Sequence, residues 1–398
     1  MARGTGLASA VLALATGTLV VGLGRAGQTR SDAIQAPPTV SLYEAGTVQT
    51  SAPAPRAVVA GTQCDGNGNI YLVYSASIQP FMGRPQPLDL PLRKVSPGSE
   101  SSTEFQAPTP PGYVRRFVRR FFVTPRGNVY GLILAFRHAA DYKEGPDWPD
   151  SLVVKYKDDG SVDSITKLEQ PQGSHFVAQK LGVFGDGSFL VTGAELELRG
   201  ERPIASDVFT AVFDRAGAYV GPVTLSDDVR AETPQSQPAV GAKEPPQVAA
   251  GRNGDSDSKK SVKVPFYQEV GGGFMLASAD GSIYLFRATS PARVYVILPG
   301  GLVTRQFHIT PPASGLVPMQ ASLGGQGELL AVFTEPATAS ESGPVMALVD
   351  PQTGQVLQVV AAPPPTAGFL GCLSPEGAFL FVRTSKDEHL EVAKFVSR

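Results

Sequence analysis

The chain has 398 residues, of which 43 are Gly and 35 are Pro, so that turn-forming residues make up about a fifth of the total. Only 18% of the residues are charged, below the roughly one quarter of an average soluble domain, and this composition favours an all-β protein. The formal net charge of −2 argues against nucleic-acid binding, which requires a clearly basic face.

Residues 1–26 are typical of a secretory signal peptide. Arg3 precedes an apolar stretch, Leu7 to Gly24, and the chain then continues with a small-x-small cleavage pattern ending at Ala26. An uncleaved anchor is the alternative, because the apolar stretch is at the lower length limit for crossing a bilayer. We expect a secreted or periplasmic protein with a disordered linker over residues 27–38 and no membrane contact after cleavage.

One short pattern occurs six times along residues 39–398: an apolar strand, a turn that contains Gly, and a second apolar strand. The turn glycines are Gly68, Gly127, Gly187, Gly281, Gly327 and Gly377. A second hairpin follows in most units, so each unit has four antiparallel strands, as in a propeller blade. The sequence therefore predicts a single all-β domain, a six-bladed β-propeller of four-stranded antiparallel blades.

The sixth unit ends one strand short, and the ring needs that strand to close. The segment TVSLYEAGTVQT, residues 39–50, is an extra strand before the first blade. We predict that this N-terminal strand becomes the outermost strand of blade six and leaves no long edge unpaired. Closure would bring Cys64 and Cys372 onto adjacent blades, where they form either a disulfide or two buried free thiols.

Long connections are expected on one face of the ring, which we call the long-loop face. Three of them join the second and third strands of blades one to three: Ala76–Pro91, Arg137–Asp150 and Leu196–Ser206. The stretch 226–263, rich in Pro, Gln, Ser, Asp and Lys, is predicted to be a disordered insertion on the same face. Because binding sites concentrate on long loops, we expect a ligand site there.

Polar residues at the starts of the first strands support that site. Arg56, Arg115 and His175 occupy equivalent positions in blades one to three, and Arg116 follows Arg115. The long loop of blade two adds Glu144 and the only tryptophan, Trp148. These six residues could receive an anionic or sugar-like group. Alternatively, YVRRFVRR is the start of a strand with solvated arginines and Trp148 anchors a loop.

Two known families resemble parts of the chain. The turns Asp65–Tyr71 and Gly127–Tyr130 resemble the D-x-x-G-N-I-Y-like turn of NHL-repeat propellers, which implies a fold and no chemistry. EGPDW, residues 144–148, resembles the E-G-P-x-W element of the regucalcin and gluconolactonase family, whose Glu binds a metal ion. In that family the element opens the first blade, whereas here it lies in an outer loop of blade two, and a chance match is the alternative.

The remaining residues give no catalytic signature. The four histidines have no metal-ligand spacing, and a G-x-S-x-G elbow is absent, so we expect neither a metal nor another cofactor. Asp65, Asp186 and Asp280 are expected to accept hydrogen bonds from turn amides.

These observations lead to one expected function and one alternative. We expect an exported, monomeric binding module that takes a small ligand, a saccharide or a protein partner on the long-loop face. The alternative is an enzyme of lactonase or quinoprotein dehydrogenase type that uses the central funnel.

Overall fold

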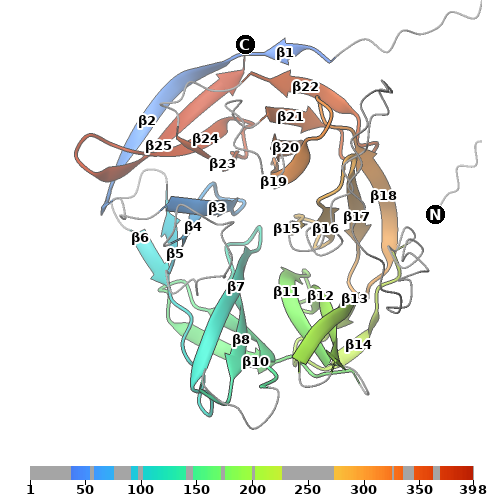
Figure 1. The fold of residues 1–398 in the computed structure, drawn as a ribbon. Coiled ribbons are helices and arrows are strands. Elements are labelled where there is room, and N and C mark those ends of the chain that lie inside the picture. The colour runs from blue at the N-terminus through green and yellow to red at the C-terminus, as the bar shows by residue number, and fades with distance from the viewer. Residues whose placement is uncertain are drawn as a thin grey trace, which may run out of the picture. The chain divides into compact units, whose positions relative to one another are not determined.

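The computed structural model describes residues 37–53, 58–75, 91–96, 102–139, 147–171, 175–199, 202–225, 273–324, 327–334, 345–361 and 368–397. The compact unit Pro37–Arg398 contains six β-sheets that are arranged around a common centre (Figure 1). The described ranges contain strands and turns but no helix, and therefore none that is long and apolar enough to cross a membrane.

Each sheet is one blade, and its strands follow the chain from the centre of the ring outwards. Blades one to three consist of β3 (Val58–Cys64), β4 (Ile70–Ser75), β5 (Leu92–Val95) and β6 (Ser102–Phe105); β7 (Arg115–Val123), β8 (Val129–Phe136), β9 (Asp150–Tyr156) and β10 (Val162–Lys167); and β11 (His175–Val183), β12 (Phe189–Arg199), β13 (Arg202–Phe213) and β14 (Tyr219–Pro222).

Blades four to six complete the ring. They consist of β15 (Phe274–Ala277), β16 (Ile283–Arg287), β17 (Ala292–Ile297) and β18 (Val303–Ile309); β19 (Val317–Leu323), β20 (Leu329–Thr334), β21 (Val345–Val349) and β22 (Val356–Val360); and β23 (Phe369–Leu373), β24 (Phe379–Thr384), β25 (His389–Ser397) and the N-terminal β2 (Leu42–Pro53). The predicted six-bladed propeller is confirmed, including its closure by an N-terminal strand.

The six repeated turns have one geometry. Each turn glycine has a φ between 77° and 88°, the left-handed region that glycine adopts at no steric cost. Its amide donates to the carbonyl three residues earlier at 2.9–3.1 Å. Asp186 and Asp280 accept the amides of Ser188 and Ser282, each at 2.9 Å, so the predicted turn-capping role is confirmed.

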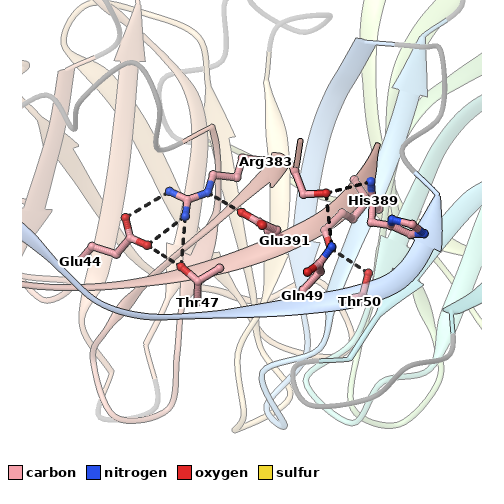
Figure 2. Close-up of polar contacts among 9 residues, drawn as sticks. Glu44, Thr47, Gln49, Thr50, Arg383, His389 and Glu391 are labelled. Atoms are coloured by element: carbon pink, nitrogen blue, oxygen red, sulfur yellow. Dashed lines mark hydrogen bonds and ion pairs between the residues drawn. The ribbon is translucent and has the colours of Figure 1, made fainter. Parts of the chain in front are cut away.

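The outer seam of blade six is held by side chains as well as by the ladder. β2 runs antiparallel to β25, and Arg383 of β24 contacts both Glu44 of β2 and Glu391 of β25 (Figure 2). The hydrogen bond from Arg383 lowers the pKa of Glu44. The buried Thr50 hydroxyl donates to the Leu390 carbonyl at 3.0 Å.

A further short strand, β1 (Thr39–Val40), extends blade five by pairing parallel to β22, which the sequence did not predict.

Apolar side chains fill the spaces between successive blades. Five clusters of buried residues lie around the ring; one of them, for example, packs Ile70 and Leu72 of blade one against Leu380 and Val382 of blade six. Every described residue of β16 is buried, as expected for a strand covered on both sides. The disulfide Cys64–Cys372, with Cα atoms 6.1 Å apart, joins the innermost strands of the same two blades.

The prediction of a long loop at Leu196–Ser206 is wrong. Residues 196–199 and 202–206 are strand residues, because β12 and β13 continue their ladder to the pair Arg199 and Arg202. The alternation of acidic and leucine side chains along Glu195–Leu198 fits a continued strand of period two. The other connections placed on the long-loop face lie largely outside the described residues, at 76–90, 140–146 and 226–272.

Candidate functional site

The innermost strands of four blades carry a β-bulge at the same height. The residues left out of the pairing are Ala60, Arg119, Gln179 and Met319, each eight positions before the turn glycine of its blade. A bulge interrupts the two-residue alternation of a strand, so consecutive side chains can face the same side. On β7 the two residues at the bulge are Arg119 and Arg120, and both line a cavity on the axis of the ring.

This central cavity has a volume of about 200 Å³ and is lined by residues from the innermost strands of all six blades. It is larger than the roughly 150 Å³ cavity that accommodates a benzene molecule. Three of its lining residues are charged, Arg119 and Arg120 of blade two and Lys180 of blade three, and we call them the cationic cluster. The cavity therefore has room for a small molecule beside three basic side chains.

The cationic cluster has no counter-charge among the described residues. The six innermost strands, as far as the structure describes them, contain no Asp or Glu. Within the same ranges, Arg119, Arg120 and Lys180 make no hydrogen bond or ion pair, and the buried Nε atom of Arg119 has no partner. Lys180 is buried and both arginines are half-buried, and charged groups withdrawn from water are normally paired, so this arrangement costs folding free energy that a bound anion would offset.

Burial has its largest effect on Lys180, whose residue is only 8% exposed. Burial, followed by charge repulsion from Arg120 and Arg119, lowers the pKa of Lys180 well below its usual value. Burial also lowers the pKa of Arg119 and that of Arg120. A guanidinium stays protonated in proteins, so the two arginines keep their charge while the lysine is driven toward the neutral amine.

The opposite wall of the cavity is polar but already hydrogen-bonded. Gln320 of blade five donates to the Thr62 hydroxyl at 2.6 Å, and Thr62 donates to the Leu370 carbonyl at 2.7 Å. Gln63 bridges blades one and two by donating to the Phe121 carbonyl at 2.7 Å and accepting from the Val123 amide at 2.8 Å. These bonds fix the blades to one another and leave the cationic cluster as the unpartnered polar part of the wall.

The remainder of the lining is largely apolar. Phe121, Phe122, Leu181, Phe274, Met275 and Leu370 all border the cavity. An apolar wall lowers the local dielectric constant and strengthens the attraction between the cationic cluster and a bound anion. A second cavity of about 140 Å³ shares Thr62, Gln63 and Met275 with the first and is also bordered by Cys64 and Cys372.

Three of the residues predicted to bind a ligand are linked near the starts of β7 and β11. Arg115 binds Asp147 at 2.6 Å and lies over the Phe136 ring, 3.8 Å from its centroid. Trp148 stacks on His175 with ring centroids 4.5 Å apart. Segment 147–149 thus joins blade two to blade three, and the Arg115 guanidinium is occupied by a carboxylate of its own chain.

The other predicted residues lie elsewhere. Arg116 donates to the Ala107 carbonyl at 2.7 Å and does not line the central cavity. Arg56 and Glu144 lie outside the described residues, so the resemblance of EGPDW to a metal-binding element is not tested. Among the described residues, no three His, Cys, Asp or Glu side chains gather in a group that could hold a metal ion.

The cationic cluster was not predicted from the sequence, although a signal was present. In the segment YVRRFVRR, Arg115 and Arg116 were predicted to bind a ligand, with solvated arginines as the alternative, whereas Arg119 and Arg120 line the central cavity. The signal is the contrast between innermost strands that lack acidic residues and the basic residues concentrated in blades two and three.

Comparison with known proteins gives a fold-level likeness only. No family model and no curated protein matches the chain. A protein of unknown function from Dyadobacter fermentans is 9% identical over 90% of this chain and 99% of its own, with a TM-score of 0.47. A gluconolactonase from Xanthomonas campestris is 10% identical over 89% and 99%, with a TM-score of 0.40. An α-L-arabinanase from Penicillium chrysogenum is 11% identical over 89% and 98%, with a TM-score of 0.42.

Proposed function

We propose that this protein is an exported binding protein that takes a small organic anion into its central cavity. The observation that carries the proposal is the cationic cluster, Arg119, Arg120 and Lys180, which has no counter-charge among the described residues. A bound carboxylate would supply that charge and accept hydrogen bonds from the guanidinium groups. The gain in binding free energy is large because the same guanidinium groups are unpaired in the free protein.

The cavity favours a particular kind of anion. Its volume of about 200 Å³ limits the ligand to a small molecule, and its phenylalanine and leucine side chains favour a ligand with an apolar part. Inorganic anions lack that part, and polyanions such as nucleic acids are too large for the cavity. A short-chain carboxylic acid matches both the charge and the lining.

The proposal also includes the face by which the ligand enters and the compartment in which the protein acts. We place ligand entry on the long-loop face, because β7 and β11 begin there with Arg115 and His175. Export is supported by the apolar N-terminal stretch and by the disulfide Cys64–Cys372, since disulfides persist in oxidising compartments. An NHL-type relationship is also proposed, on the turn in which Asp65 accepts the amides of Asn67 and Asn69.

The enzyme alternative would use the same cavity. A metal-dependent lactonase needs at least three oxygen or nitrogen ligands that converge on one point. The described walls instead present the guanidinium groups of Arg119 and Arg120, whose positive charge attracts an anion and repels a metal ion. This observation is why we propose binding of an organic acid in preference to metal-assisted hydrolysis.

The test is calorimetric titration of the purified protein with sodium lactate, with glycerol as a neutral compound of similar size. We expect lactate to bind and glycerol not to bind. Arg120→Gln should weaken lactate binding by about tenfold or more, the usual effect of losing a charge-assisted hydrogen bond, and Lys180→Met should weaken it less, because a neutral amine donates an ordinary hydrogen bond. Arg126→Gln and Lys157→Met are matched controls, because both side chains lie on exposed turns.

The titrations distinguish lactate binding in the central cavity from binding elsewhere. Equal binding by the cavity variants and the turn variants would show that lactate binds elsewhere and would overturn the proposal. Failure of lactate, acetate and pyruvate to bind to the wild type would do the same.

A further inference from the structure

The surroundings of the Lys180 amine are those of a nucleophile. Its residue is 8% exposed, it borders the central cavity, and it has no hydrogen-bond or ion-pair partner among the described residues. Arg119 and Arg120 approach it from the neighbouring blade, and β3, β15, β19 and β23 present no charged residue within their described lengths. The amine is therefore surrounded by positive charge and apolar side chains.

This environment favours the neutral amine, which is the reactive form. Burial and the two guanidinium groups lower the pKa of Lys180. A lysine that is desolvated and lies beside another cation is activated for attack on carbonyl carbon. A purely electrostatic anion site would be better served by an ammonium group that keeps its proton.

We propose that Lys180 forms a reversible imine with the carbonyl group of a small 2-oxo acid whose carboxylate is bound by Arg119 and Arg120. The inference rests on the proposed function, because the carboxylate must first bind to the cationic cluster. In a 2-oxo acid the carbonyl carbon is bonded directly to the carboxylate carbon. An acid bound through its carboxylate by blade two thus presents its carbonyl near the lysine of blade three.

The reaction balances without an oxidant or a reductant. The Nζ lone pair of Lys180 attacks the carbonyl carbon, and the C–O π bond breaks to give a carbinolamine. The two hydrogens of the neutral amine leave with the carbonyl oxygen as one water molecule, and a C=N double bond remains. Protonation of the imine nitrogen gives an iminium ion, whose charge is offset by the neighbouring carboxylate of the bound acid. The apolar lining favours the loss of water.

The experiment is reductive trapping of the full chain with pyruvate and sodium cyanoborohydride, followed by proteolysis and mass spectrometry. We expect one modified lysine, Lys180, that gains the mass of pyruvic acid less one oxygen atom. Its modification should exceed that of exposed lysines such as Lys157 by about tenfold or more. Lactate has no carbonyl group and should give no adduct, but it should compete with pyruvate and reduce the labelling.

Four variants test the assignment of the adduct to Lys180. Lys180→Met and Lys180→Arg should both abolish the specific adduct, and Lys180→Arg does so while keeping a cation in the cavity. Lys157→Met should leave the labelling of Lys180 unchanged. Arg119→Gln combined with Arg120→Gln should reduce it by about tenfold, because the carboxylate is then no longer bound beside the amine.

Failure of the inference can be distinguished from failure of the proposed function. If lactate and pyruvate bind with an affinity that depends on Arg120, but pyruvate is not trapped on Lys180, the cavity is a non-covalent anion site and the inference is overturned. If neither acid binds, both proposals are overturned. Labelling of Lys180 no greater than that of Lys157 would also contradict the imine.

Discussion

The indole ring of Trp148 lies parallel to the imidazole ring of His175, with an angle of 8° between the planes and 4.5 Å between the centroids. The contact joins segment 147–149 of blade two to the first residue of β11 in blade three. Asp147, the preceding residue, binds Arg115 at the start of β7. Two adjacent innermost strands are thus tied together at their N-terminal ends, above the cavity that contains the cationic cluster.

This stack makes the only tryptophan a local probe. His175→Ala should expose one face of the Trp148 ring, so its fluorescence emission should shift to longer wavelength and acrylamide should quench it more strongly. Loss of an aromatic pair costs only about 0.5–1.5 kcal/mol, so the fold should persist. His308→Ala, at an exposed position on β18, is the matched control. Identical emission from both variants would contradict the stack.

Lys180→Met should stabilise the free protein. The substitution removes a buried amine that folding drives toward its neutral form at a cost in free energy, and it keeps an unbranched side chain of similar length. Replacing buried ionisable groups by apolar residues can gain about 1–4 kcal/mol. Urea unfolding followed by circular dichroism measures the gain. Lys157→Met should change the free energy of unfolding little, because its side chain is exposed. A strongly destabilised Lys180→Met would mean that the amine has a stabilising partner.

The stability advantage of Lys180→Met should shrink as the pH rises. The pKa of Lys180 is lowered in the folded state, so between that lowered value and about 10.4, the ordinary value of lysine, the unfolded chain holds a proton that the folded chain lacks. Stability therefore rises with pH across this window in the wild type and not in the variant. Unfolding free energies measured from neutral pH to pH 10 test this, and parallel curves would contradict it.

Deleting residues 39–50 should destabilise the whole ring. The deletion removes β1 and most of β2, exposes the edge of β25, and separates Arg383 from Glu44 and Leu390 from the Thr50 hydroxyl (Figure 2). Differential scanning calorimetry should show a lower melting temperature in a single transition. The exposed ion pair contributes little by itself, so Glu44→Gln should have a small effect and serves as the control. An unchanged transition in the truncated protein would refute closure by this strand.

Removing the disulfide should weaken the contact between the innermost strands of blades one and six. Cys64→Ser with Cys372→Ser releases β3 from β23 across a sequence separation of 308 residues, and loss of a native disulfide typically costs about 2–5 kcal/mol. Urea unfolding of the double variant measures this loss. When the double variant also lacks residues 39–50, the loss of unfolding free energy should differ from the sum of the losses caused by each change alone, because both changes open the same pair of blades. Strict additivity would show that the two closures act independently.

Much of the fold could be predicted from local signals in the sequence. The six turn glycines mark positions where the backbone needs a positive φ, and that requirement depends on residues only a few positions apart. The count of strands then left blade six incomplete, which identified residues 39–50 as the closing strand. Asp186 and Asp280 were recognised as turn caps for the same reason, since their partners lie two residues away.

Tertiary structure alone decided the candidate site. Strict alternation along β7 would place Arg119 and Arg120 on opposite faces, and only the bulge against β8 brings both to the central cavity. A bulge depends on the register between two strands, which the residues of one strand do not specify. The pairing of Arg115 with Asp147 is also non-local, and the sequence did not predict it. The sequence by itself determined where the chain turns and how many blades it makes, whereas the packing of six strands around one axis determined which charges meet there.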